Sequence, residues 1–223
     1  MKQKRINIFV GHFGSGKTEV AVNYAIRLVK GGNRTSIVDL DIVNPYFRTK
    51  DAQEALEKHG IWVITPMYAN TNVDVPALPP EINTLFERKD YTAVFDVGGD
   101  DIGARALSRY RDEITSEEYE LFAVINTRRP MTQSAEKIEE MIADLMAGSR
   151  LQVTGLINNT NLLQDTKAEN ILEGQKIIEQ AAARLHIPIR YISGFGEAAE
   201  QAGKAAGLEV LSLEKLISLP WDR

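Results

Sequence analysis

Residues 11–18 of this 223-residue chain read GHFGSGKT, which matches the phosphate-loop pattern G-x-x-x-x-G-K-[ST] at every specified position. An apolar, strand-like run (Ile6 to Val10) precedes the loop, and a helix-like run follows from Lys17. In such a loop the backbone N–H groups turn toward phosphate oxygens, Lys17 approaches the β- and γ-phosphates, and the Thr18 hydroxyl binds Mg²⁺. The residues predicted to bind nucleotide here are Gly11, His12, Phe13, Gly14, Ser15, Gly16, Lys17, Thr18 and Glu19.

The composition limits the functions open to the chain. With 43% hydrophobic residues over 223 positions, we expect one domain spanning residues 1–223. The chain has no cysteine, so it cannot by itself build a disulfide, a thiolate zinc site or a cysteine-held iron–sulfur cluster. The net charge of −5 gives no strong signal for nucleic-acid binding.

Membrane signals are weak, and we expect a cytoplasmic protein. No apolar stretch approaches the length of about 18 residues that a spanning helix needs, and the opening Met-Lys-Gln-Lys-Arg runs straight into the first predicted strand. The segment Leu213 to Arg223 has apolar positions but few basic ones, and Pro220 interrupts it. This pattern predicts a docked terminal helix rather than a membrane-binding tail.

Short apolar and β-branched runs alternate with amphipathic segments along the chain, which is typical of repeated strand–helix units. Most of these runs are apolar at every position, which indicates a sheet covered on both faces. The expected fold is α/β, a three-layer, doubly wound, mostly parallel sheet of about seven or eight strands, as in P-loop NTPases. The predicted strands are Arg5 to Val10, Thr35 to Leu40, Ile61 to Ile64, Ala93 to Val97, Leu121 to Asn126, Val153 to Asn158, Ile189 to Ile192 and Glu209 to Leu211.

Helix ends and one long loop are also marked in the sequence. The helix that follows the phosphate loop is predicted to end at Gly31-Gly32. A later helix is predicted to open with the capping box Thr166-x-x-Glu169. The stretch Thr65 to Pro80 is rich in Pro, Asn and Thr, and its length indicates a functional surface loop.

Carboxylates end two of the predicted strands, where a phosphate loop needs partners for its metal ion. In Val38-Asp39-Leu40-Asp41, the alternation of an extended strand points Asp39 and Asp41 to the same side. The second group is Asp96-Val97-Gly98-Gly99-Asp100, an apolar strand that ends in a carboxylate followed by glycines. Both groups are predicted at the carboxyl edge of the sheet, where nucleotides bind in this class of fold.

These motifs together resemble the ATPases that include the chromosome-partition and Min-system proteins, the nitrogenase iron protein and related metal-cluster carriers. The resemblance covers most of the chain in the order of its motifs. Residues 11–18 match the phosphate loop of that group, residues 38–41 resemble its first switch, and residues 96–100 are similar to its second switch. Gly155-Leu156-Ile157-Asn158-Asn159 resembles the strand whose terminal asparagine reads adenine.

The resemblance implies a set of roles, with ATP and Mg²⁺ as cofactors. Asp41 would orient the attacking water, Asp96 would hold Mg²⁺ through water, and Asp100 would relay the state of the γ-phosphate. The residues assigned to catalysis are Lys17 and Asp41; to Mg²⁺, Thr18, Asp41 and Asp96; to the base, Asn158 and Asn159; and to the switches, Asp39, Gly99 and Asp100. It also implies a homodimer.

Two departures from the group concern the phosphate loop. Its second position is usually a lysine that reaches the phosphates of a partner subunit, and here it is His12. Phe13 takes a position that is often glycine. Three arginines are candidates to replace the missing charge, because guanidinium stabilises transferring phosphoryl groups. They are Arg48, Arg128 and Arg129, and His12 itself is the fourth candidate.

Three functions follow from these observations. The leading interpretation is a nucleotide switch that binds Mg-ATP, hydrolyses it and changes its contact with a partner protein. The alternative is an ATP-dependent kinase or ligase resembling dethiobiotin synthetase, with Thr65 to Pro80 lining the pocket for a small-molecule substrate. A third interpretation is a module that binds nucleotide without turnover. No Asn-Lys-x-Asp motif is present, so guanine is the less expected base, and the lack of cysteine argues against carriage of an iron–sulfur cluster.

Overall fold

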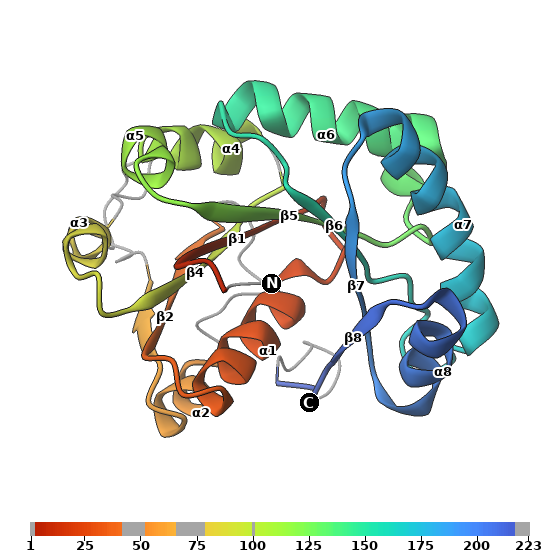
Figure 1. Cartoon of the computed structure of the whole chain (residues 1–223), viewed down its shortest axis with the longest axis horizontal. Helices are drawn as coiled ribbons and strands as arrows, with labels where there is room; N and C mark the ends of the chain where they lie inside the picture. Colours follow the sequence, from red (N-terminus) through yellow and green to blue (C-terminus); the bar gives the residue numbers. More distant parts are fainter. Residues whose placement is uncertain (1–2, 42–51, 66–78, 100, 217–223) are drawn as a thin grey trace, which may run out of the picture.

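The strands of this protein lie in one parallel sheet with helices on both faces, as the computed structural model shows over residues 3–41, 52–65, 79–99 and 101–216 (Figure 1). The strands are β1 (Ile6–Val10), β2 (Thr35–Leu40), β3 (Trp62–Ile64), β4 (Thr92–Val97), β5 (Tyr119–Ile125), β6 (Gly155–Asn158), β7 (Ile189–Gly194) and β8 (Glu209–Ser212). Within the described residues the sheet has 8 strands in the order β3-β2-β4-β1-β5-β6-β7-β8, and neighbouring strands pair in parallel. The predicted α/β fold and the positions of its strands are confirmed.

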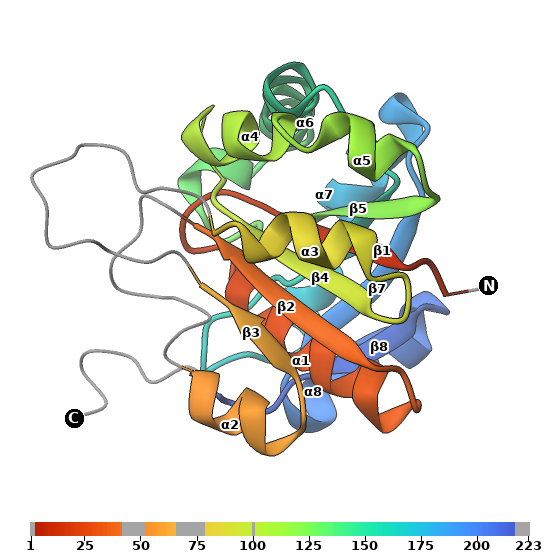
Figure 2. The same cartoon turned by 90° about the vertical axis from the view of Figure 1, so that its left-hand side faces the viewer.

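Helices cover the two faces of the sheet unequally, as the side view in Figure 2 shows. They are α1 (Lys17–Lys30), α2 (Gln53–Lys58), α3 (Glu81–Glu87), α4 (Asp101–Ser108), α5 (Arg111–Thr115), the 3₁₀ turn η2 (Pro130–Thr132), α6 (Ala135–Ser149), α7 (Ala168–Leu185) and α8 (Gly196–Ala206). Helices α1 and α2 pack on one face, α3 to α7 pack on the other, and α8 packs on α7 at the β7–β8 edge. The layers are therefore helix, sheet and helix.

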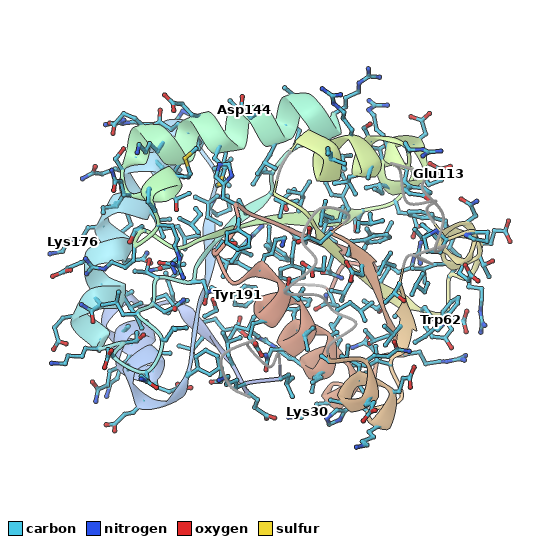
Figure 3. All side chains as sticks on the ribbon, turned by 180° about the vertical axis from the view of Figure 1, so that it is seen from behind. Lys30, Trp62, Glu113, Asp144, Lys176 and Tyr191 are labelled. Carbon is cyan, nitrogen blue, oxygen red and sulfur yellow. The ribbon has the colours of Figure 1, made fainter. Side chains whose placement is uncertain are left out.

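The two faces have separate apolar cores. On the α1 face, Phe9 packs against Tyr24 and Phe122 with ring centroids 5.0 and 5.3 Å apart. Tyr191, labelled in Figure 3, joins this cluster at 6.3 Å from Tyr24. On the other face, Phe86 of α3 stacks on Phe95 of β4 at 5.9 Å. Burial on both faces explains why these strands are apolar throughout rather than at alternate positions.

The strand order places the phosphate loop at the middle of the carboxyl edge. Strand β1 pairs with β4 on one side and β5 on the other, so the loop after β1 lies between the ends of those strands. Strand order reverses at this point, because β4 and β2 extend to one side and β5 to β8 to the other. A crevice at such a reversal is where open α/β sheets bind ligands.

One prediction of local structure is wrong, and the predicted terminal helix, Leu213 to Arg223, is only partly covered by the described residues. The helix α7 begins one residue later than the predicted capping box requires: the Lys167 N–H donates to Asn170 Oδ1 at 3.0 Å, while Thr166 Oγ1 donates to the Leu163 carbonyl at 2.6 Å. Residues 213–216 are irregular rather than helical, and residues 217–223 lie outside the described part. None of the described helices combines the length and the hydropathy that a bilayer crossing requires.

Candidate phosphate-binding site

The loop of residues 11–16 turns sharply from β1 into α1. The Ser15 N–H donates to the His12 carbonyl at 3.0 Å, and Gly16 has φ +81°, in the left-handed region. A Cβ on Gly16 would lie 2.4 Å from Asn159 Nδ2, so the position requires glycine for both conformation and space. The helix then starts at Lys17, which leaves its first N–H groups free of partners within the helix and directed at the loop.

On the β2 and β4 side, the loop is flanked by buried carboxylates. Lys17 Nζ donates to Asp41 Oδ2 at 2.5 Å, and their side chains are only 7% and 4% exposed. Asp39 and Asp96 are direct neighbours in the β2–β4 register and are also buried. Since Val38 and Leu40 pack in the opposite core, Asp39 and Asp41 share the α1 side of the sheet, as predicted.

Charge is unbalanced in this cluster. Burial and the neighbouring Asp96 raise the pKa of Asp39 to about 8, although the Asp41 N–H donates to Asp39 Oδ1 at 2.9 Å. Burial works to lower the pKa of Lys17, but the charges of Asp96, Asp41 and Asp39 outweigh it and the pKa is raised. Three carboxyl groups thus face a single ammonium group, and the site favours additional positive charge.

On the β6 and β7 side, neutral hydrogen bonds hold the loop. Asn159 Nδ2 donates to the Ser15 carbonyl at 2.7 Å, and Asn159 Oδ1 accepts from Ser193 Oγ at 2.9 Å. Asn158 is turned away from the loop, since its Nδ2 donates to Gln175 Oε1 at 3.0 Å and to the Ile171 carbonyl. Both asparagines thus form hydrogen bonds within the protein, and their assignment to the base stays a prediction.

The segment after β4 lies directly against the phosphate loop. A Cβ on Gly99 would be 1.9 Å from the Gly11 carbonyl oxygen and 2.7 Å from the His12 nitrogen, so only glycine fits here. Half-burial lowers the pKa of His12, against the opposing effects of Asp144 on α6 and a hydrogen bond to the Gly99 backbone. The imidazole is therefore neutral at pH 7. Asp144 is labelled on α6 in Figure 3.

The structure separates the arginines that were candidates for the missing lysine. Arg129 Nε donates to the Gly14 carbonyl at 2.9 Å, which places its side chain on the phosphate loop. Arg128 instead forms an ion pair with Glu173 of α7. Arg48, Asp100 and most of the loop Thr65 to Pro80, including its residues 66–78, lie outside the described residues.

The donor set fits a magnesium ion held together with phosphates. Thr18 is buried beside Lys17 at the start of α1, and Asp41 and Asp96 end the strands next to it. No group of three or more His, Cys, Asp or Glu side chains within the described residues forms a metal cage of its own. Mg²⁺ does not need such a cage, since it keeps several waters and binds one or two carboxylates plus substrate phosphates.

Exposed apolar side chains lie at the same edge of the sheet as the site. The large apolar side chains that the described residues expose all follow the carboxyl ends of strands: Phe13, Ile102, Met131, Leu162, Leu163 and Phe195. Phe13, in the phosphate loop itself, is 70% exposed. We call this set the apolar rim.

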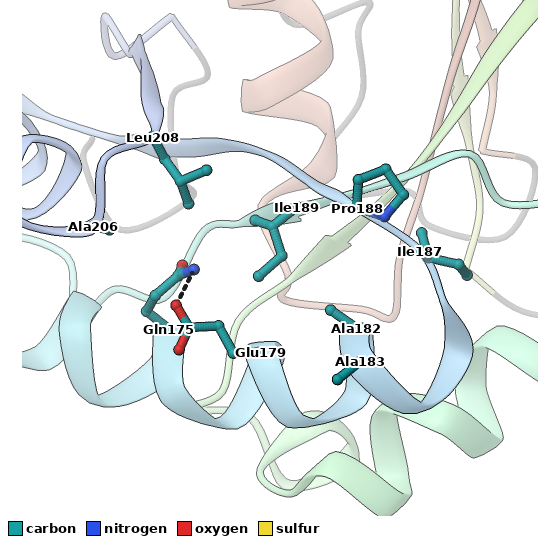
Figure 4. A pocket seen from close by; sticks show the side chains of 9 residues that line it. All are labelled: Gln175, Glu179, Ala182, Ala183, Ile187, Pro188, Ile189, Ala206 and Leu208. Carbon is teal, nitrogen blue, oxygen red and sulfur yellow. Dashed lines mark hydrogen bonds between the residues drawn. The ribbon is translucent and has the colours of Figure 1, made fainter.

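A groove lies on another part of the surface. It has a volume of about 360 Å³ and lies between α7, the start of β7 and the end of α8 (Figure 4). Its polar edge is a pair of α7 side chains, with Gln175 Nε2 donating to Glu179 Oε1 at 3.1 Å. Ile189 begins β7, so the groove lies at the end of the sheet opposite the phosphate loop.

Some contacts of the site were not foreseen in the sequence. Ser193 supports Asn159, and its position at the end of β7 before Gly194 is the kind of strand-end signal that pointed to Asp41 and Asp96. The segment after β8 is joined to α1: Glu214 N donates to Asn23 Oδ1 at 2.8 Å, and Leu216 N donates to Glu19 Oε1 at 2.7 Å. Glu19 therefore has a structural partner beside the loop.

Comparison with known proteins gives one family and a set of fold relatives. The family model described as the CobQ/CobB/MinD/ParA nucleotide binding domain matches residues 8–202. No curated protein matches the chain at a significant level.

Three solved structures illustrate the fold. The signal recognition particle receptor FtsY from Elizabethkingia anophelis has 14% identity and a TM-score of 0.53, over 97% of this chain and 64% of that one. Chloroplast FtsY from Physcomitrella patens has 15% identity and a TM-score of 0.61, over 92% and 66%. FlhF complexed with GTP/Mg(2+) has 14% identity and a TM-score of 0.53, over 84% and 64%. The chain thus spans just under two thirds of these structures, and at such identities the likeness concerns the fold.

Proposed function

This chain belongs to the CobQ/CobB/MinD/ParA nucleotide-binding domain family, and on that premise we propose that it is a Mg-ATP-dependent switch that hydrolyses ATP. The observation that carries the proposal is the buried ion pair between Lys17 and Asp41, at 2.5 Å, next to two further carboxyl groups. Bound nucleotide would draw Lys17 to its phosphates and bring Mg²⁺ to the carboxylates. Binding would thereby redistribute the excess negative charge of the cluster.

Each residue of the site then has a role. The N–H groups of residues 14–18 would surround the phosphates, the Thr18 hydroxyl would bind Mg²⁺, and Asp96 would hold the ion through water. The ion would neutralise charge that develops on the phosphate oxygens. With Lys17 turned to the phosphates, Asp41 would accept a hydrogen bond from the attacking water.

The reaction is hydrolysis of the terminal phosphate. The water oxygen bonds to the γ-phosphorus as the bond to the β–γ bridging oxygen breaks, which yields ADP and inorganic phosphate. The protein supplies positioning and charge rather than a covalent intermediate.

The contact between Gly99 and the Gly11 carbonyl supports the switch. Because Gly99 leaves no space at the loop, a change in the loop on nucleotide binding must displace the segment that leads into α4. We propose that Gly99 and the neighbouring Asp100 transmit the state of the γ-phosphate through this displacement.

The apolar rim supports a homodimer whose copies meet over the nucleotide. Exposed apolar side chains follow the carboxyl ends of five strands at one edge of the sheet, and apolar side chains exposed on one side of a protein can mark an interaction site. In a two-fold interface both copies contribute the same surface, so one contact would cover the apolar rim of each copy.

We propose adenine as the base and the cytoplasm as the compartment. The chain reads Asn158-Asn159-Thr160-Asn161 where an Asn-Lys-x-Asp signature would read guanine. The fold relative FlhF is complexed with GTP/Mg(2+), so the two bases need a direct comparison.

ATP turnover by the purified protein tests the proposal. The wild type, Lys17→Ala and Asp41→Ala are assayed with Mg²⁺ and either ATP or GTP over a range of protein concentrations, with the exposed Lys30→Ala as the matched control. We expect a preference for ATP, loss of turnover in the first two variants but not in the control, and a rate per molecule that rises with concentration. Turnover that survives Lys17→Ala would contradict the proposed site, and a rate that does not change with concentration would contradict a dimer-dependent reaction.

A further inference from the structure

Among the described residues, Arg129 is the positively charged residue whose side chain lies on the outer surface of the phosphate loop. Its Nε donates to the Gly14 carbonyl at 2.9 Å, and Gly14 itself has φ +78°. A guanidinium group carries five N–H donors in a planar fork. Among the described residues, the two terminal nitrogens of Arg129 have no hydrogen-bond or ion-pair partner, so the bond to Gly14 fixes the group and leaves four donors available.

The turn that carries Arg129 is held in place from several sides. The Arg129 N–H donates to the Asn126 carbonyl at 3.1 Å, and the same carbonyl accepts from Thr132 Oγ1 at 2.7 Å. Lys137 Nζ donates to the Pro130 carbonyl at 2.6 Å, which ties the turn to α6. A fixed backbone at this point is what a residue needs to present its side chain to a ligand with little loss of entropy.

The other described candidates for the missing positive charge are placed differently. His12 is half-buried against the Gly99 backbone and is neutral at pH 7. Arg128 is directed to Glu173 of α7 and forms an ion pair there. The two consecutive arginines thus contact different elements: Arg129 contacts the phosphate loop, and Arg128 contacts the helix α7.

We propose that Arg129 is a phosphate-binding residue that contacts the terminal phosphate of the nucleoside triphosphate bound by its own chain, in place of a lysine from a partner subunit. This inference rests on the proposed nucleotide function. A guanidinium fork matches two phosphate oxygens at once and stabilises charge on a transferring phosphoryl group. Because the charge comes from the same chain, recognition of the third phosphate does not need a second copy, whose proposed effect is on turnover.

Paired binding measurements test the role of Arg129. Calorimetry with Mg²⁺ compares a non-hydrolysable ATP analogue with ADP for the wild type, Arg129→Ala, Arg129→Gln and Arg128→Ala. We expect Arg129→Ala to weaken binding of the triphosphate by about tenfold or more and of ADP by less than about threefold. In turnover assays kcat should fall by roughly 10³-fold, as for other arginines that act on the transferring group.

Two variants separate phosphate contact from support of the loop. Arg129→Gln keeps an N–H donor for Gly14 but no charge, so it should lose triphosphate affinity as Arg129→Ala does. Arg128→Ala should bind both nucleotides as the wild type does. Equal loss for the analogue and for ADP in Arg129→Ala, or wild-type binding of both, would overturn the inference. A wild-type protein that binds neither nucleotide would instead overturn the proposed function, together with this role of Arg129.

Discussion

The two flanks of the phosphate loop differ in their side chains, which are charged on one flank and neutral on the other. Toward β2 and β4, the loop faces carboxyl groups that are buried and too numerous for the single Lys17. Toward β6 and β7, it rests on Asn159 and Ser193, a neutral amide and a hydroxyl that are joined by a hydrogen bond. The electrostatic free energy of the first flank changes when a charged ligand binds. The neutral hydrogen bonds of the second flank hold the backbone in place with or without that ligand. A loop that must respond to a ligand and still hold its shape needs both.

The largest effect is expected from removing the cation of the charged flank. Lys17→Met removes the cation that faces the buried carboxyl groups of Asp41 and Asp96, and we expect the free energy of unfolding to fall by about 3–5 kcal/mol. Chemical denaturation in the absence of nucleotide measures it. The exposed Lys30, which pairs with Glu214 at 3.3 Å, gives the control: Lys30→Met should change stability by less than about 0.5 kcal/mol. Equal stability of the two variants would show that the flanks do not differ in this way.

A methyl group at Gly99 should have the next largest effect, because it collides with backbone rather than with a flexible side chain. Its Cβ would lie 1.9 Å from the Gly11 carbonyl oxygen, and we expect Gly99→Ala to cost about 3 kcal/mol and to weaken nucleotide binding. Gly60→Ala gives the contrasting case: no atom lies within 4 Å of the added methyl, so any loss there comes from the φ of +75°, which Gly99 does not share. Thermal unfolding and calorimetry measure both effects. Wild-type nucleotide affinity in Gly99→Ala would contradict the proposed coupling.

The neutral flank is expected to give a smaller, graded response. Asn159→Ala removes the donor to the Ser15 carbonyl and the acceptor for Ser193, so we expect a loss of about 2 kcal/mol. Ser193→Ala removes only the second of these bonds and should cost about 1 kcal/mol. Salt distinguishes this flank from the charged one, since both losses should be the same at low and high ionic strength. A loss in Asn159→Ala that varies strongly with salt would mean that this flank is electrostatic after all.

The smallest effect concerns an ion pair at the opposite edge of the sheet. The hydrogen bonds from Arg5 to Glu117, at 2.5 Å, lower the pKa of that carboxyl below its ordinary value of 4.5. Its stabilisation is therefore present above about pH 4.5 and is lost as the pH falls through the lower folded-state pKa, and it amounts to about 1 kcal/mol. Unfolding curves between pH 3 and pH 7 should show this loss in the wild type and not in Glu117→Gln. Glu118→Gln, at the exposed neighbour, should behave as the wild type.

The sequence predicted the charged flank better than the neutral one. Asp39, Asp41 and Asp96 end apolar runs, and the alternation of a strand determines which side they face, so local spacing was enough. Asn159 also ends a strand, but its contact with Ser15 depends on how closely β6 approaches the loop. That approach depends on the packing of the whole sheet, which the sequence does not display locally.

The arginines show the same limit. Arg128 and Arg129 are adjacent and chemically identical, so no sequence pattern separates them. They are separated by the turn after β5, where Asn126 Oδ1 accepts from the Arg128 N–H at 3.0 Å and its carbonyl accepts from the Arg129 N–H. The capping box was misplaced for a related reason. Thr166 bonds to the loop before it, so its hydroxyl is not available to cap α7.

The bonds between α1 and the segment after β8 also set an order of events during synthesis. Glu19 and Asn23 receive their partners Leu216 and Glu214 from positions 197 and 191 residues further along the chain. At about 5–20 residues per second, a ribosome needs roughly 10–40 s to supply them after the phosphate loop has emerged. The first functional motif of the chain to be translated is thus among the last to be completed, and nascent chains that stall before residue 214 carry the loop on a helix whose outer contacts are still missing.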